Sequence, residues 1–158
     1  MPLVVCIGNE LVADDAAGFE VHDCLSQILP PTVRLAYCAV SGLALLDLLD
    51  GSEDTLVVVD AVQLGAPVGF VHCLDTDQLP GSCAGAVSAH GIGLRDTLQI
   101  GLTLYPDLMP RHITLVGIEG RCFNLPRIHM SAAVVHAIPL AVQQVLCLLH
   151  LEGRSRAA

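Results

Sequence analysis

The chain has 158 residues, which is enough for one domain with a hydrophobic core of its own. Hydrophobic residues make up 53% of it, charged residues 15% and aromatic residues 3%, so the core must consist mainly of Val, Leu, Ile and Ala, and the composition excludes a disordered chain. The formal net charge of -9 repels the phosphates of nucleic acids and of anionic lipids. We therefore expect no nucleic-acid partner and no membrane partner.

The N-terminal residues and the cysteines indicate where the protein acts. No basic stretch precedes the first apolar run, and no run reaches the roughly 18 apolar residues of a membrane span, so we expect a cytoplasmic protein. The 7 cysteines are odd in number and scattered, and none form a Cys-x-x-Cys pair, so neither a disulfide framework nor a zinc knuckle is indicated. We expect residues 1–151 to form a single domain, residues 152–158 to form a short disordered tail, and the protein to be a monomer.

The first half of the chain alternates predicted strands and helices. Residues 3–7 are apolar throughout, which is typical of a strand covered on both faces. Apolar residues at helical spacing follow, with acidic residues in the first turn and Pro30 as the stop, and they predict a helix at about residues 14–29. The pattern continues with a strand, a helix and a strand that closes on Asp60, at residues 33–38, 43–49 and 55–59.

The second half adds an edge strand and a long loop. Residues 70–74 follow without room for a helix, so they predict an antiparallel strand at the edge of the sheet. Residues 75–89 are rich in Gly, Ser, Ala and Asp and predict a loop long enough to be functional. The chain continues with a helix, a strand and a last helix that Pro139 should kink or restart, at about residues 92–104, 113–118 and 132–151.

The order of these elements predicts an α/β fold. We expect a single-domain three-layer sandwich in which a twisted, mostly parallel sheet has helices on both faces. Such sheets bind ligands beyond the carboxyl ends of their strands. Functional residues are therefore expected in the loops that follow Ile7, Cys38, Val59 and Ile118.

The first of these loops carries carboxylates instead of phosphate-binding glycines. Glu10, Asp14 and Asp15 lie where a dinucleotide-binding fold has its glycine-rich turn, and the chain contains neither G-x-G-x-x-G nor a P-loop motif. This loop is better suited to a cation than to phosphate. The alternative is that Asp14 and Asp15 only cap and charge the N-terminus of the helix that follows.

Asp60 and His90 are two further candidate metal ligands. Asp60 ends a central strand beside the first loop, and His90 stands between the long loop and the next helix. Two carboxylates and one imidazole form a mixed oxygen and nitrogen site for a borderline divalent ion such as zinc or nickel, with a coordination position left open. Taken singly, Asp60 could be a turn or cap residue and His90 a capping or surface histidine. His129 is a weaker candidate, and the other histidines are interpreted as structural.

A competing arrangement is a nucleophile elbow built on Cys83. Residues 81–85 have the G-x-nucleophile-x-G spacing, and His90 follows as a possible base for a cysteine hydrolase. An elbow requires a strand before it, whereas the residues before Gly81 are polar and end in Pro80. We therefore interpret Cys83 as an incidental loop thiol.

Four blocks in a fixed order give a more specific signal. They read Gly8-Asn9-x-Leu11-x-x-Asp14-Asp15-x-x-Gly18, Val58-Val59-Asp60-Ala61, Ser88-Ala89-His90-Gly91-Ile92-Gly93-Leu94 and Ile113-Thr114-Leu115-Val116-Gly117-Ile118. With these blocks the chain resembles, along nearly its whole length, the hydrogenase maturation endopeptidases, which remove the C-terminal extension of the nickel-iron (NiFe) hydrogenase large subunit once the metal centre has been inserted. The resemblance implies a five-stranded twisted sheet between helices and a metal-binding trio of Asp15, Asp60 and His90.

The resemblance also implies a partner and a metal. The partner is the large-subunit precursor, and the metal is nickel that the precursor carries and that the trio recognises, although zinc or cadmium could occupy the same site in vitro. A metal held by the enzyme itself, activating water, is the other mechanism compatible with the sequence. Asp14 or Glu10 is a possible base for the attacking water. The alternative from another functional class is a nickel-binding hydrogenase accessory protein that cuts nothing.

Two departures from the family pattern bear on specificity. The family often has Glu at the position of Asp15, so the carboxylate here is one methylene shorter and must approach the ion more closely. The family also often has an Asp-Gly-Gly segment after the second strand, where this chain reads Tyr37-Cys38-Ala39-Val40-Ser41-Gly42. This change indicates a different hydrogenase class as substrate.

Overall fold

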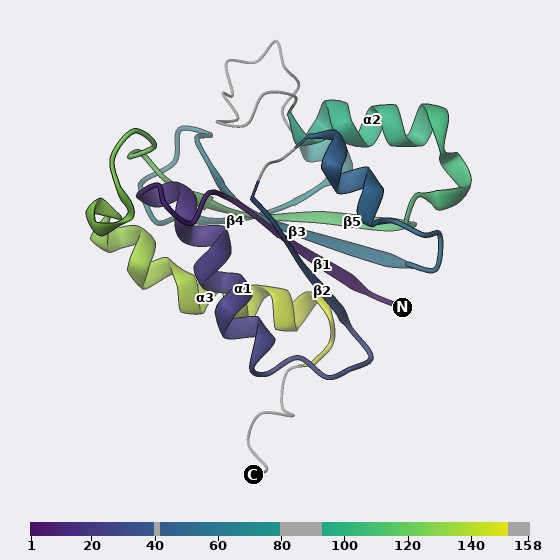
Figure 1. The fold of residues 1–158 in the computed structure, drawn as a ribbon, viewed down its shortest axis with the longest axis horizontal. Coiled ribbons are helices and arrows are strands. Elements are labelled where there is room, and N and C mark those ends of the chain that lie inside the picture. The colour runs from purple at the N-terminus through teal and green to yellow at the C-terminus, as the bar shows by residue number, and fades with distance from the viewer. Residues whose placement is uncertain (40–41, 80–92, 152–158) are drawn as a thin grey trace.

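The computed structural model describes residues 1–39, 42–79 and 93–151 of the chain. The strands of these ranges are β1 (Leu3–Ile7), β2 (Arg34–Cys38), β3 (Thr55–Val62), β4 (Val71–Asp75) and β5 (His112–Glu119). They form one sheet in the order β2-β1-β3-β5-β4 (Figure 1). The first four in this order pair in parallel, and β4 pairs antiparallel with β5 at the edge, which confirms the predicted edge strand.

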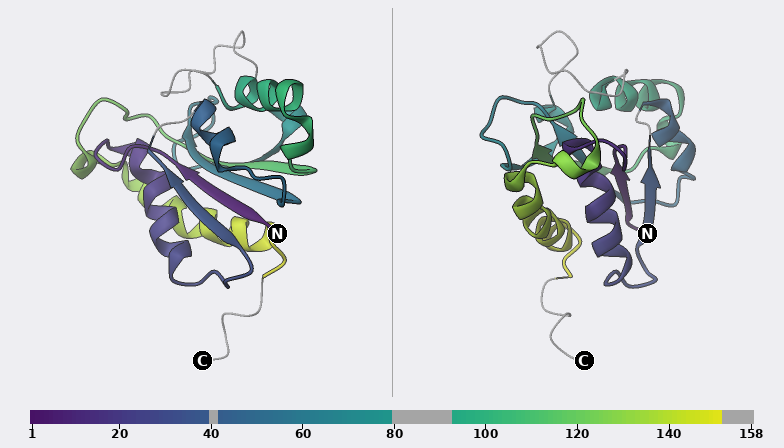
Figure 2. Two further views of the ribbon diagram at one scale, coloured as in Figure 1. Left: turned by 45° about the vertical axis from the view of Figure 1, so that its right-hand side comes forward. Right: turned by 60° about the vertical axis from the view of Figure 1, so that its left-hand side comes forward.

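Helices cover both faces of this sheet. The α-helices of the described residues are α1 (Ala17–Ser26), α2 (Leu94–Leu104) and α3 (Ala132–Leu148), and short 3-10 helices include η1 (Asp14–Ala16), η2 (Leu43–Leu48) and η6 (Arg127–His129). Helices α1 and α3 lie against one face, and α2 lies with η2 against the other (Figure 2). The α/β fold with a mostly parallel five-stranded sheet between helices is thus the predicted one.

The core has two halves because side chains alternate along each strand. In β1, Val4 and Cys6 pack with α1 and α3, whereas Leu3, Val5 and Ile7 pack with η2 and α2. All five of these side chains are buried, as the uninterrupted apolar run predicts for a central parallel strand.

Strand β3 is longer than the sequence predicts. It continues past residue 59 to Val62, so Asp60 lies inside the strand and not at its end. The reason is the neighbouring strand, because β5 also continues and pairs Asp60 with Gly117 and Val62 with Glu119. A carboxylate after an apolar run predicts the end of a strand, but here the backbone of residues 60–62 still pairs with β5.

Three predicted helices differ in detail. The helix expected at residues 14–29 begins with the 3-10 turn η1 and ends at Ser26. The helix expected at residues 43–49 is the 3-10 helix η2, in which Leu45 N–H donates to Gly42 C=O. Helix α3 runs through Pro139 without a restart, and Pro139 lies on its exposed side, where water can reach the backbone carbonyl that loses its donor.

The predicted long loop lies largely outside the described residues. Its first part forms the 3-10 turn η3 (Thr76–Gln78), which is closed by a capping box between Asp75 and Gln78. Residues 80–89 of the loop, residue 92 of the helix expected from there, and the tail expected at residues 152–158 are outside the described ranges, and the helix itself begins at Leu94. In those ranges, no helix is both long and apolar enough to cross a membrane.

Candidate active site

The carboxyl ends of β1, β3 and β5 lie along one edge of the sheet, where the sequence predicts the functional loops. Asp15 enters this edge from η1, which follows the loop after β1. Its side chain is buried, and the backbone N–H of Asn9 donates to Asp15 Oδ2 at 3.0 Å. Asp15 is therefore held against the turn that ends β1.

Two glycines allow this turn to lie so close to the helix. Gly8 has a φ of +145°, and a Cβ on it would collide with the backbone carbonyl oxygen of Asp15. A Cβ on Gly18 would collide with the carbonyl oxygen of Ile7. Both glycines belong to the first sequence block, and their physical role is to bring the N-terminus of α1 against the end of β1.

Asp60 lies on the strand next to β1. Because side chains alternate along β3, Asp60 faces the same side as Leu56 and Val58, which pack with η2 and α2. Its side chain is largely buried, and η1, the turn that carries Asp15, packs against β3. The structure therefore brings Asp15 and Asp60 to the same edge of the sheet on two elements in contact.

The third predicted ligand, His90, lies outside the described residues, as does Cys83. The segment that contains both precedes α2, which lies on the face of the sheet toward which Asp60 points. Among the side chains of the described ranges, no three His, Cys, Asp or Glu groups are arranged to hold a metal ion. The trio of Asp15, Asp60 and His90 stays a prediction.

Asp14 has a different environment from Asp15. Its fully buried carboxylate accepts hydrogen bonds from the backbone N–H groups of Arg121, Cys122 and Ser131 and from the Ser131 hydroxyl, at 2.6 to 2.9 Å. Burial raises the pKa of the Asp14 carboxyl, but these hydrogen bonds outweigh it and hold the pKa below its usual value. Asp14, weighed in the sequence as a possible base, thus binds the segment after β5.

The loop after β1 and the segment after β5 are joined along their backbones. Val12 and Pro126 form a β-bridge, Ala13 N–H donates to Leu125 C=O, and Arg127 N–H donates to Leu11 C=O. These two segments come from strands that are not neighbours, because β3 lies between β1 and β5. Together with the Asp14 carboxylate, the bridge forms a two-segment rim at the carboxyl edge, made of residues 9–15 and 120–131.

Aromatic side chains support the rim from the side of β2. The Tyr37 hydroxyl donates to Gly8 C=O at 2.6 Å, and burial raises the pKa of this phenol. Phe19 packs edge-to-face against Tyr37, and the Arg127 guanidinium lies over the Phe19 ring while it pairs with Glu20. The position of Tyr37 at the end of β2 is the signal that could have identified it.

Glu119 is a buried carboxylate that the sequence analysis does not single out. It ends β5 and accepts hydrogen bonds from the backbone N–H groups of Leu64 and Gly65, and it lies 2.8 Å from His72 Nε2. Its place directly after the apolar run of a central strand, like that of Asp60, is the signal that could have found it. The contact agrees with a structural role for His72, whereas His129, the weaker candidate, is exposed on η6.

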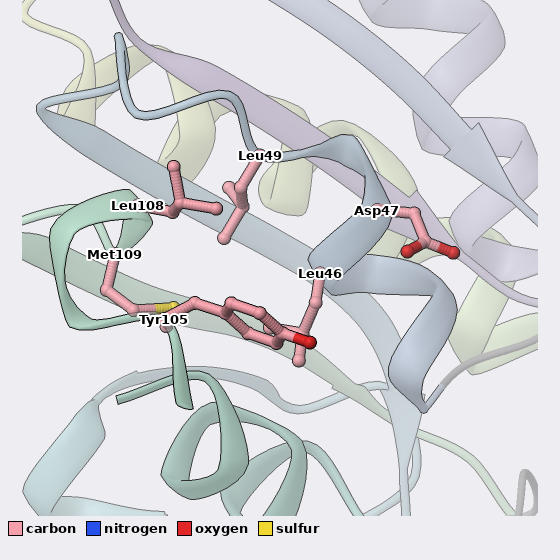
Figure 3. Close-up of a pocket in the computed structure, with 6 residues that line it drawn as sticks. All are labelled: Leu46, Asp47, Leu49, Tyr105, Leu108 and Met109. Carbon is pink, nitrogen blue, oxygen red and sulfur yellow. The ribbon is translucent and has the colours of Figure 1, made fainter. Parts of the chain in front are cut away.

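One cavity lies elsewhere in the molecule. Its volume is about 310 Å³, and it is formed between η2 and the segment that leads from α2 to β5 (Figure 3), by Leu46, Asp47, Leu49, Tyr105, Leu108 and Met109. This segment precedes β5, so the cavity is at the amino end of that strand. It is therefore separate from the candidate site, and its lining is mainly apolar.

Most of the chain is similar to known proteins. A family model described as a hydrogenase maturation protease matches residues 28–147. The hydrogenase 2 maturation protease of Escherichia coli strain K12 is 30% identical over 155 residues, which span 96% of this chain and 92% of that protein.

Solved structures give the same result. The structure described as the hydrogenase maturating endopeptidase HybD from E. coli has a TM-score of 0.79 and 30% identity, and the match covers 97% of this chain and 94% of that one. An endopeptidase from E. coli, solved in solution, has a TM-score of 0.81 and 29% identity over 99% of this chain and 100% of that one. The similarity thus extends well beyond single motifs.

Proposed function

Because the chain belongs to the hydrogenase maturation protease family, we propose that it is an endopeptidase that removes the C-terminal extension of a NiFe-hydrogenase large-subunit precursor after nickel insertion. The observation that carries this proposal is the pair of buried carboxylates, Asp15 and Asp60, on touching elements at the carboxyl edge of the sheet. On this proposal the enzyme acts in the cytoplasm on a folded, metal-loaded partner.

The two carboxylates recognise the nickel that the precursor carries. Carboxylate oxygens together with the imidazole of His90 suit a borderline divalent ion and leave coordination positions for the ligands of the precursor. The nickel is thus part of the substrate, and zinc or cadmium can replace it in vitro. Asp15 reaches less far than a glutamate would, so the precursor must bring its metal close to the turn at Gly8.

The chemistry is the hydrolysis of one peptide bond. A water oxygen adds to the scissile carbonyl carbon, the C–N bond breaks, and the leaving amine takes up the proton that the water gives up. Of the two carboxylates weighed as the base, Asp14 already accepts four hydrogen bonds, whereas Glu10 is exposed in the same rim. We assign the base to Glu10, with Asp15 and Asp60 holding the substrate.

The decisive experiment compares two forms of the same precursor. Purified protein is mixed with nickel-loaded and nickel-free large-subunit precursor from the same cell, and the precursor mass is followed with time. Loss of a short C-terminal peptide from the loaded form alone is the expected result. Equal cleavage of both forms would support the protease activity but contradict nickel recognition. No cleavage of a verified cognate precursor would favour the accessory-protein alternative.

A further inference from the structure

Three apolar side chains are exposed on the two paired segments of the rim. The exposed fractions are 73% for Leu11, 45% for Leu125 and 88% for Ile128. Leu11 belongs to the loop after β1, and the other two to the segment after β5, where Arg127 N–H donates to Leu11 C=O at 2.9 Å. We refer to these three residues as the rim apolar surface.

The exposure of this surface is fixed by the backbone beneath it. The Val12–Pro126 bridge and the hydrogen bond from Ala13 N–H to Leu125 C=O hold the two segments side by side. The buried Asp14 carboxylate fastens both ends of the second segment, at Arg121 and at Ser131. The backbones that carry the three side chains are therefore held next to each other, and exposed apolar side chains that lie together on a surface are typical of a contact surface.

The charge of the segment after β5 differs from that of the chain as a whole. The chain carries 16 acidic residues, but residues 120–131 contain none of them and include Arg121, Arg127 and His129. The Arg127 guanidinium pairs with Glu20, whereas Arg121 is exposed. The exposed Glu10 lies on the other segment of the rim, beside Leu11, so a negative charge of a ligand is expected to lie over the segment after β5, near Arg121.

One part of the surface is on the loop that leads to the candidate site. Leu11 is in the same loop as Asp15. In this loop the backbone N–H of Asn9, two residues before Leu11, donates to Asp15 Oδ2. A polypeptide bound across the rim apolar surface would therefore contact the same loop that holds Asp15. The cavity at η2 does not include this loop, because it lies at the amino end of β5.

We propose that the rim apolar surface docks an apolar segment of the large-subunit precursor, with a carboxylate of that segment paired to Arg121. The proposal rests on the proposed function. It names a part of the enzyme that binds the precursor independently of the metal. Leu11 and Ile128 are its apolar contacts, and Arg121 is its charged contact.

The first test removes the apolar contacts. The double variant Leu11→Ser with Ile128→Ser should fold normally, because both side chains are exposed, and should raise the Kd for the nickel-loaded precursor about tenfold or more by calorimetry. In cleavage assays the same variant should raise KM with kcat nearly unchanged. The matched control is Leu140→Ser on α3, whose side chain is 56% exposed and which should bind as the wild type does.

The outcomes separate this proposal from the proposed function. An unchanged Kd in the double variant overturns the docking surface, even if the wild type cleaves the precursor. If the double variant has a raised Kd but the wild type does not cleave the precursor, the result supports the docking surface and contradicts the proposed protease activity. If the wild type is a dimer that the double variant converts to monomers while the Kd for precursor stays the same, the surface is a contact between copies of this chain and the proposal fails.

A second test concerns the charge. Arg121→Gln keeps the backbone N–H that donates to Asp14 and removes only the guanidinium charge. The variant should weaken precursor binding about threefold at low salt, and the difference from the wild type should shrink as the ionic strength rises. Equal affinity and an equal salt dependence in the two proteins would exclude the acidic part of the proposed ligand.

Discussion

Asp14 and Asp15 are adjacent in the sequence, but their carboxylates bind different parts of the chain. Asp14 accepts hydrogen bonds from Arg121, Cys122 and Ser131, which belong to the segment after β5. Asp15 accepts one from Asn9 in its own loop. Asp14 thus joins the loop after β1 to the segment after β5, whereas Asp15 lies at the edge of the sheet where Asp60 lies.

The role of Asp14 predicts a loss of stability on substitution. Asp14→Asn keeps the size of the side chain but replaces one acceptor oxygen with an NH₂ group that faces backbone N–H donors. We expect the free energy of unfolding to fall by about 2 to 4 kcal/mol, measured by urea denaturation. Asp23→Asn, at an exposed position of α1, should change it by less than about 0.5 kcal/mol. Equal midpoints for the two variants would contradict this role of Asp14.

The same residue predicts a pH dependence. The Asp14 pKa is lowered in the folded protein, whereas an aspartate in an unfolded chain titrates near about 3.9. The unfolded state therefore takes up this proton first as the pH falls, so the contribution of Asp14 is complete above about pH 5 and is lost as the pH drops through the lower native pKa. The stability difference between wild type and Asp14→Asn should be constant from neutral pH down to about pH 5 and should shrink below about pH 4. A difference that grew on acidification would have the wrong sign.

Asp60 is the most direct test of metal recognition. Asp60→Asn is nearly isosteric, and we expect a folded protein whose processing rate for nickel-loaded precursor is at least about 100-fold lower, because a charged ligand oxygen is lost. Circular dichroism and the mass of the precursor with time measure the two effects. Asp107 is exposed in the segment between α2 and β5, so Asp107→Asn is the matched control and should process normally. Normal processing by a folded Asp60→Asn protein would remove Asp60 from the site.

Gly18 predicts a backbone requirement. In Gly18→Ala the new Cβ would meet the carbonyl oxygen of Ile7, so α1 must move away from β1. We expect a loss of about 3 kcal/mol or more in the free energy of unfolding, or failure to fold. Gly93→Ala is the control, because a Cβ there meets only the Asp96 side chain at ordinary van der Waals distance. A thermal melt of the two variants should separate them by many degrees.

Much of the fold could be predicted because each strand has its own local pattern. The apolar runs at residues 3–7, 55–59 and 113–118 identify the central strands, and the lack of room for a helix before residue 70 identifies the antiparallel edge. The end of β3 could not be predicted, because residues 60–62 are held by pairing with Gly117, Ile118 and Glu119, which lie more than 50 residues away in the sequence.

The candidate site could be predicted in part for a similar reason. The common position of Asp15 and Asp60 could be predicted because both residues follow the apolar runs of neighbouring parallel strands, whose carboxyl ends lie along one edge of the sheet. The hydrogen bonds of Asp14 could not be, because its partners are mainly backbone N–H groups, which every residue except proline carries, so they leave no mark in the sequence. The hydrogen bonds of Glu119 could not be predicted for the same reason, because Leu64 and Gly65 donate backbone N–H groups.

The hydrogen bonds of Asp14 also constrain the order in which the protein can mature on the ribosome. They span 107 to 117 residues, so the loop after β1 emerges long before the segment that fastens it. Once β5 has left the ribosome, every strand of the described sheet is available. The rim is still incomplete at that point, because Asp14 cannot accept its hydrogen bonds from Ser131 until Ser131 has left the exit tunnel. Competence to bind a precursor should therefore arise late in synthesis, close to the release of α3, so that an incomplete chain does not engage its substrate.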